Sequence, residues 1–131
     1  MSALKLVTDD RVARFVAERC EAQIMPPFTQ MGIERDGEIV AGVVFNNWSA
    51  RDVDVSVAGD RGTFTRGFLR AVGRYVFEQA GCSRMSITTR HANVCDIARR
   101  LGAKVEGVKR DRHGPGQDAF MLGILKNDWA F

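Results

Sequence analysis

The chain has 131 residues, of which 45% are hydrophobic and 27% charged, and its formal net charge is +3. This length and balance predict a single globular domain over residues 1–131 and leave little room for a second. No apolar run approaches the roughly 20 residues that a bilayer-spanning helix needs, so no membrane role is expected. The mild basicity suits an anionic ligand such as a phosphate or nucleotide, and alone it does not indicate nucleic acid.

The cysteines and histidines favour neither a disulfide scaffold nor a metal site. The cysteines are Cys20, Cys82 and Cys95, an odd number without a C-x-x-C pair, and no secretory signal opens the chain. We therefore expect free thiols in a reducing cytoplasm. With only His91 and His113 no zinc-ligand spacing can be assembled, and no metal is expected.

The N-terminal region predicts a strand followed by a helix. Residues 4–7 form a short apolar run. Thr8 is the expected N-cap, with Asp9 and Asp10 in the first helical turn. Apolar residues then follow helical spacing as far as Cys20, before Pro26 and Pro27 interrupt regular structure.

Three strands are predicted next. Residues 28–34 and 38–45 flank an Asp-Gly pair at residues 36–37, which is a strong hairpin signal. A second turn is expected over residues 46–50. The strand over residues 51–58 alternates, so one face should carry Val53, Val55 and Val57 and the other Asp52, Asp54 and Ser56.

Glycine-rich residues 59–62 separate this strand from a long helix. The helix is predicted to begin at Thr63 or Thr65 and to end near Ala80, with Gly81 as its stop. A strand over 84–89, a short helix over 94–101, and strands over 103–109 and 119–125 complete the chain. The order β-α-β-β-β-α-β-α-β-β implies a mixed sheet with one right-handed parallel crossover.

The turn between the strand ending near Ala58 and the long helix is a candidate phosphate site. A helix N-terminus presents unpaired N–H groups and a positive dipole end. Gly59 and Gly62 would allow close backbone approach, and Arg61 and Arg66 could add charge. The alternative is an ordinary strand–helix turn with a threonine cap.

The C-terminal half resembles the GCN5-related N-acetyltransferase (GNAT) superfamily. The segments that carry the resemblance are "FLRAVGRYVFEQAGCSRMSI" and "NVCDIARRLGAKVEGVKRDRHGPGQDAFMLGILKNDW". Residues 40–60 and 65–72 further resemble small members from phage and prophage genomes. The resemblance implies an α/β (α+β) fold with a mixed, mostly antiparallel sheet of six or seven strands flanked by helices. It also implies acetyl-coenzyme A as cosubstrate and direct transfer of acetyl to a primary amine of an unidentified small-molecule or protein acceptor.

The resemblance also implies a cofactor site. The family's usual Q/R-x-x-G-x-G/A is here Asp60-Arg61-Gly62-Thr63-Phe64-Thr65-Arg66, so the first inner glycine becomes Thr63 or Phe64. Asn93 matches an asparagine that the family places near the pantetheine arm, and it is also a candidate N-cap. The implied cofactor-binding residues are Val55, Val57, Arg61, Gly62, Thr63, Phe64, Thr65, Arg66 and Asn93.

For catalysis the resemblance implies a carboxylate base on the alternating strand, acting directly or through water. Asp54 is the first candidate and Asp52 the second; the alternative is that both simply face solvent. Many members carry a tyrosine as general acid, but the matching position is Ala98. Tyr75 is expected to pack in the core, and Cys95 or a water could replace the acid.

An alternative function follows from the missing glycine and tyrosine. The chain could keep the fold without efficient catalysis and act as a protein-binding module, for example a phage factor directed at a host protein. Nucleic-acid binding through basic residues 104–112 lacks a stacking platform and is not expected. The resemblance leaves a homodimer open.

Overall fold

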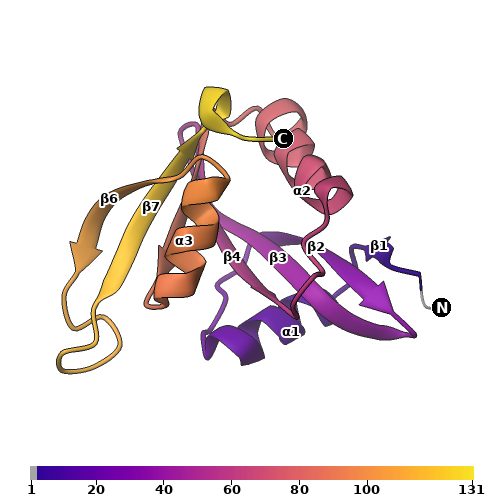
Figure 1. Ribbon diagram of the computed structural model, residues 1–131, viewed down its shortest axis with the longest axis horizontal. Helices are drawn as coiled ribbons and strands as arrows, with labels where there is room; N and C mark the ends of the chain where they lie inside the picture. The colour runs from indigo at the N-terminus through magenta and orange to yellow at the C-terminus, as the bar shows by residue number, and fades with distance from the viewer. Residues whose placement is uncertain (1–2) are drawn as a thin grey trace.

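The computed structural model describes residues 3–131 and contains one seven-stranded sheet in the order β1-β2-β3-β4-β5-β7-β6 (Figure 1). Only β4 and β5 pair in parallel, so the mixed sheet and the predicted order of elements are confirmed. The strands are β1 (Lys5–Val7), β2 (Phe28–Arg35), β3 (Glu38–Ser49), β4 (Asp52–Gly59), β5 (Arg84–Thr89), β6 (Lys104–Lys109) and β7 (Ala119–Leu125). The helices are α1 (Arg11–Cys20), α2 (Arg66–Gly73), the π-helix η1 (Arg74–Gln79), α3 (Ala92–Arg100) and the 3₁₀-helix η2 (Lys126–Asp128).

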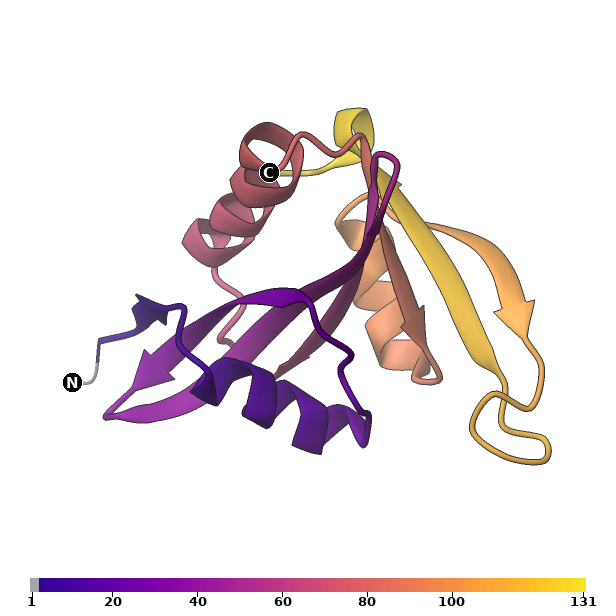
Figure 2. The ribbon, with the colours of Figure 1, turned by 180° about the vertical axis from the view of Figure 1, so that it is seen from behind.

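Helices cover the two faces of the sheet unequally. α1 lies along one face of β2, β3 and β4 (Figure 2). On this face Val12 and Val16 pack on Val44. α2, η1 and α3 lie on the other face and enclose the larger core, which includes Phe45, Phe68, Val76, Ile87 and Leu122. None of the helices among the described residues is long and apolar enough to cross a bilayer.

The β2–β3 hairpin forms as predicted, because Asp36 and Gly37 adopt the positive φ angles of 53° and 81° that a two-residue primed turn requires. The turn expected over residues 46–50 begins later, since β3 continues to Ser49. Asn46 is 7% exposed and pairs with Asp54, and an irregularity between Asn46 and Ser49 lets the strand continue.

Two predicted helix starts are wrong by two residues. The N-cap of α1 is Asp10, not Thr8, and the Asp9 carboxylate accepts a hydrogen bond from the Arg11 N–H at 3.1 Å. The chain leaves β1 at Val7 and turns before the helix can begin. The N-cap of α3 is His91, so Asn93 lies inside the first turn and is not the cap.

The predicted long helix is present but changes its winding. Thr65 is the N-cap, and its hydroxyl accepts a hydrogen bond from the Phe68 N–H at 3.2 Å. After Gly73 the chain continues as a π-helix, in which the Ala80 N–H donates to the Tyr75 carbonyl at 2.8 Å. Gly73 lies directly against the Trp129 indole, which anchors the C-terminal segment on this helix.

Candidate functional site

The parallel strands β4 and β5 are joined at one end and separate toward the other. The Arg51 carbonyl accepts hydrogen bonds from the N–H groups of Ser83 at 2.9 Å and Arg84 at 3.3 Å. Asp54 and Ser86 are the one pair in register among the described residues of these strands. Beyond this pair, which we call the vertex, the strands diverge toward their carboxyl ends (Figure 1).

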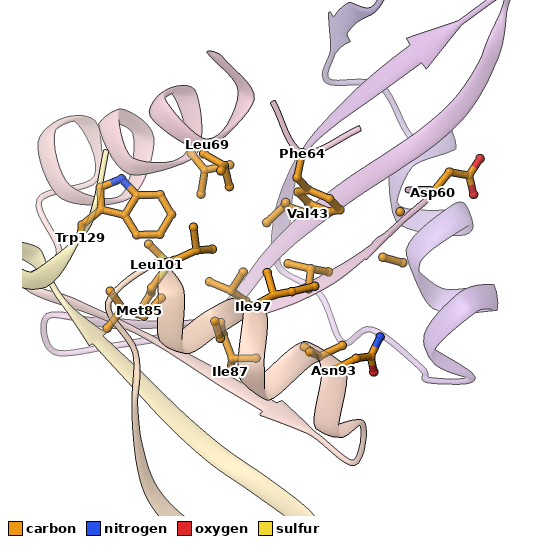
Figure 3. A pocket seen from close by; sticks show the side chains of 18 of the residues that line it. Val43, Asp60, Phe64, Leu69, Met85, Ile87, Asn93, Ile97, Leu101 and Trp129 are labelled. Carbon is orange, nitrogen blue, oxygen red and sulfur yellow. The ribbon is translucent and has the colours of Figure 1, made fainter. Parts of the chain in front are cut away.

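A cavity of about 660 Å³ occupies the gap on the face covered by α2 and α3 (Figure 3). One end, which we call the mouth, carries its polar side chains together with the turn after β4: Asp60, Arg61, Gly62 and Asn93. The opposite end, which we call the deep end, lies around Met85, Leu101 and Trp129 (Figure 3). It includes Ile124, the partner of Met85 on β7, and Val72, the neighbour of the Gly73 that contacts Trp129. The volume falls within the range of small-molecule sites in proteins.

The edge of β4 that faces the gap offers free backbone groups. The Asp60 N–H donates to the Val40 carbonyl at 2.8 Å, so the even-numbered residues of this strand exchange backbone hydrogen bonds with β3. The backbone groups of Val55 and Val57 therefore point toward β5. The parallel pairing of Asp54 with Ser86 engages the Val55 N–H, which leaves the Val55 carbonyl and the Val57 N–H facing the gap. Both residues line the cavity, and the Val57 carbonyl accepts a hydrogen bond from the Cys20 thiol at 3.4 Å.

The turn after β4 places Thr63 away from the cavity. Its side chain is fully buried, and its hydroxyl donates to the Asp60 carbonyl at 2.6 Å. Gly62 has a φ of 81° and open space around it. The Phe64 ring lines the cavity and rests on Gly59, where a Cβ would come within 2.5 Å of the ring. Of the two residues that could replace the expected glycine, Thr63 therefore takes no space in the cavity, whereas Phe64 forms part of its wall.

The charges around the mouth are mostly positive. Arg61 is exposed and lines the cavity, whereas Thr65 and Arg66 lie at the exposed start of α2 outside its lining. The Asp60 carboxylate is paired with the Arg19 guanidinium at 2.9 Å, so its negative charge is offset. An anion at the mouth would therefore meet helix N–H groups and arginines rather than an unpaired carboxylate.

The two candidate catalytic carboxylates lie on the sheet face opposite the cavity, and they differ in their partners. Both Asp52 oxygens accept from the Ser86 hydroxyl at 2.9 Å, and one lies 3.4 Å from Nε of Arg84. Asp54 is exposed at the vertex and accepts a hydrogen bond from the Asn47 amide at 3.0 Å. Asp54 is therefore the more accessible carboxylate.

An ion pair across β5, β7 and β6 holds this polar face together. The Arg84 guanidinium donates to the Glu106 carboxylate at 2.6 Å, and this hydrogen bond lowers the pKa of Glu106 and raises that of Arg84. The pair lies over Gly123, where a Cβ would collide with both side chains. Sequence reasoning missed the pair because its partners are brought together only by strand order.

No thiol in the described chain is an activated nucleophile. Burial raises the pKa of Cys20, Cys82 and Cys95, and a raised pKa disfavours the reactive thiolate.

Tyr75 packs on the Phe45 ring at 4.8 Å, and its hydroxyl shares a hydrogen bond with Thr29 at 2.6 Å. Among residues 3–131 no three histidine, cysteine or acidic side chains are arranged to hold a metal ion.

Several lining residues could not have been assigned from the sequence. Leu69 and Val72 belong to the apolar side of α2, and Trp129 stands near the end of the chain, so each has an ordinary packing interpretation in the sequence. Trp129 does pack, against Phe77 at 6.2 Å, but it also closes the cavity. These side chains come from two distant segments, α2 and the C-terminal residues, and no local pattern marks their convergence.

Comparison with known proteins identifies the fold. No protein-family model matches the chain, and no curated protein matches it in sequence. A structure of spermidine/spermine N-acetyltransferase SpeG from Vibrio cholerae is similar with a TM-score of 0.70 and 13% identity, covering 95% of this chain and 93% of that one. A protein assigned to the GNAT acetyltransferase family from Desulfovibrio desulfuricans gives a TM-score of 0.72 and 14% identity, covering 95% and 99%. The expected GNAT acetyltransferase fold is thereby confirmed.

Proposed function

We propose that the protein is an N-acetyltransferase that transfers acetyl from acetyl-coenzyme A to a primary amine. The observation that carries the proposal is the cavity between the diverging β4 and β5, with a helix N-terminus at its mouth and a carboxylate at its vertex. The similar structures from Vibrio cholerae and Desulfovibrio desulfuricans, which are named as acetyltransferases, support the same reaction class.

The donor would enter from the mouth. The first backbone N–H groups of α2 have no partner within the helix. The Thr65 side chain accepts from the Phe68 N–H, so the N–H groups of Arg66 and Gly67 would be available to a pyrophosphate. Arg61 adds positive charge beside them. The pantetheine amides would pair with the Val55 carbonyl and the Val57 N–H, and the Asn93 side chain at the mouth could bond the same arm.

The acceptor would approach the vertex from the opposite sheet face, where Asp54 is exposed. The amine nitrogen attacks the thioester carbon, a C–N bond forms and the C–S bond breaks. The amine proton passes to Asp54, directly or through water, and the departing thiolate takes up a proton. The raised pKa values of the thiols favour this direct transfer over a cysteine-bound intermediate.

Acetyl-coenzyme A is expected to raise the melting temperature. Binding to the folded state alone contributes RT ln(1 + [L]/Kd), about 2.7 kcal/mol at a hundredfold excess over Kd. For a domain of this size the shift should be several degrees. Thermal unfolding with coenzyme A, acetyl-coenzyme A and AMP, the last lacking the pantetheine arm, measures it. The absence of any shift at millimolar ligand would favour a protein-binding module on the same fold.

Two substitutions at the turn should weaken donor binding more than one farther along the helix. Arg61→Ala removes a charge at the mouth and should raise Kd about fivefold to tenfold. Gly62→Val forces a β-branched residue into a φ of 81° and blocks backbone approach, so an effect of roughly tenfold or more is expected.

The matched control is Arg74→Ala, because Arg74 is exposed in η1 and does not line the cavity. Titration calorimetry with acetyl-coenzyme A measures all three variants. Equal effects from Arg61→Ala, Gly62→Val and Arg74→Ala would place the donor site elsewhere.

A further inference from the structure

The cavity extends past the vertex, toward the end where β4 and β5 are joined. Asp54 pairs with Ser86, so Met85 lies level with Val53, one residue on the joined side. Ile124 is the partner of Met85 on β7 and also lines the cavity. The lining of the cavity therefore reaches beyond the level at which a thioester at the vertex would react. Met85 and Ile124 are buried there, so the accessible surface at this end belongs to Leu101 and Trp129.

The deep end is apolar throughout. Its lining consists of Val72, Met85, Leu101, Ile124 and Trp129, and Figure 3 shows the labelled members on the opposite side from Asp60 and Asn93. The one polar atom among these side chains, Trp129 Nε1, lies against Gly73 of α2 rather than facing the cavity. Leu101 and Trp129 remain half-buried, so apolar surface at this end is left without a protein partner.

The pantetheine arm does not account for this end. Its two amides need hydrogen-bond partners, and the backbone groups of β4 that face the gap, the Val55 carbonyl and the Val57 N–H, lie on the mouth side of the vertex. The deep-end side chains supply none. A polar arm placed there would lose its hydrogen bonds with water, whereas a hydrocarbon chain would lose nothing and gain contacts.

We propose that the deep end holds the acyl chain of longer donors, so that the site that accepts acetyl-coenzyme A binds medium-chain acyl-coenzyme A more tightly. The inference rests on the proposed function and extends it to the class of acyl group. The reaction is unchanged in its balance: the acyl carbon exchanges its bond to sulfur for one to the amine nitrogen, and coenzyme A leaves as the free thiol.

A chain-length series tests the proposal. Titration calorimetry with acetyl-, butyryl-, hexanoyl-, octanoyl- and dodecanoyl-coenzyme A gives Kd for each. Each buried methylene contributes about fourfold in affinity, so hexanoyl- or octanoyl-coenzyme A should bind at least about tenfold more tightly than acetyl-coenzyme A. Affinity should fall again at dodecanoyl, when the chain exceeds the space. A steady loss of affinity from acetyl onward would overturn the proposal.

Filling the deep end should reverse the preference. Leu101→Phe places a ring in the acyl space and should lower the ratio of hexanoyl- to acetyl-coenzyme A affinity at least about tenfold. The matched control is Leu125→Phe, because Leu125 lies exposed on the other sheet face. If Leu101→Phe does not fold, Val72→Leu adds one carbon to the same space and should shorten the preferred chain. An unchanged ratio in the filled variant would overturn the assignment.

The series separates two failures. If acetyl-coenzyme A binds and longer thioesters bind no better, the acyl site is wrong and the acetyltransferase proposal stands. If coenzyme A and all its thioesters fail to bind, both the proposed function and the acyl site are wrong.

Discussion

Asp54→Asn is expected to lower kcat by roughly 10²–10⁴ while leaving the Kd for acetyl-coenzyme A nearly unchanged. The carboxylate lies at the vertex on the face opposite the donor cavity, so it can meet the acceptor without touching the donor. A carboxylate is a much weaker base than an amine, so proton transfer through water is expected. Steady-state kinetics on an amine from a panel that shows turnover above background measures the effect.

Asp52→Asn is the matched control for this experiment. Asp52 is held by the Ser86 hydroxyl, the Val53 N–H and Arg84, so its loss should mainly lower stability. The melting temperature should fall in Asp52→Asn more than in Asp54→Asn, and kcat should show the opposite order. Wild-type rates in both variants would exclude a base on β4 and favour positioning of an already neutral amine.

Gly102→Ala is expected to destabilise the fold by about 2–5 kcal/mol, combining backbone strain with overpacking. Gly102 has a φ of 114°, and a Cβ there would collide with the Asp128 carbonyl. The substitution would therefore push the C-terminal segment, which carries Trp129, away from the end of α3. Thermal unfolding should show a loss of about 10 °C or more.

Gly116→Ala separates strain from collision. Gly116 has a φ of 73° in the loop before β7, and no atom lies within 4 Å of the position that its Cβ would take. This variant carries the backbone strain alone, about 1 kcal/mol. Equal losses in Gly102→Ala and Gly116→Ala would mean that the C-terminal segment adapts without cost.

Local patterns predicted most of the fold. The alternation of Val53, Val55 and Val57 with Asp52 and Asp54 gave the two faces of β4, because strand side chains alternate by geometry. The hairpin followed from two residues suited to positive φ angles. Helix starts were less well predicted, since several neighbouring side chains could cap each helix and tertiary pairing chose among them.

In the candidate site, too, features set by neighbouring residues were predicted and features set by tertiary contacts were not. The turn at residues 59–66 was predicted because glycine, arginine and a threonine cap are adjacent in the chain. The inward orientation of Thr63 was not, because it depends on a hydrogen bond to Asp60 and on burial beneath the turn. The sequence ranked Asp54 before Asp52 as the base, but the difference in their partners appeared only when the fold placed Ser86 and Arg84 beside Asp52.

The sequence by itself determined the order of strands and helices, the polar and apolar faces of β4, and the glycine-containing turn before α2. Only the tertiary structure decided where β4 and β5 separate, and that Val72, Leu101 and Trp129 meet at the far end of the gap. The physical reason is the sequence separation over which each kind of interaction acts. Periodicity and turn chemistry act over a few neighbouring residues, whereas a cavity is enclosed by segments whose proximity is set by sheet order and packing.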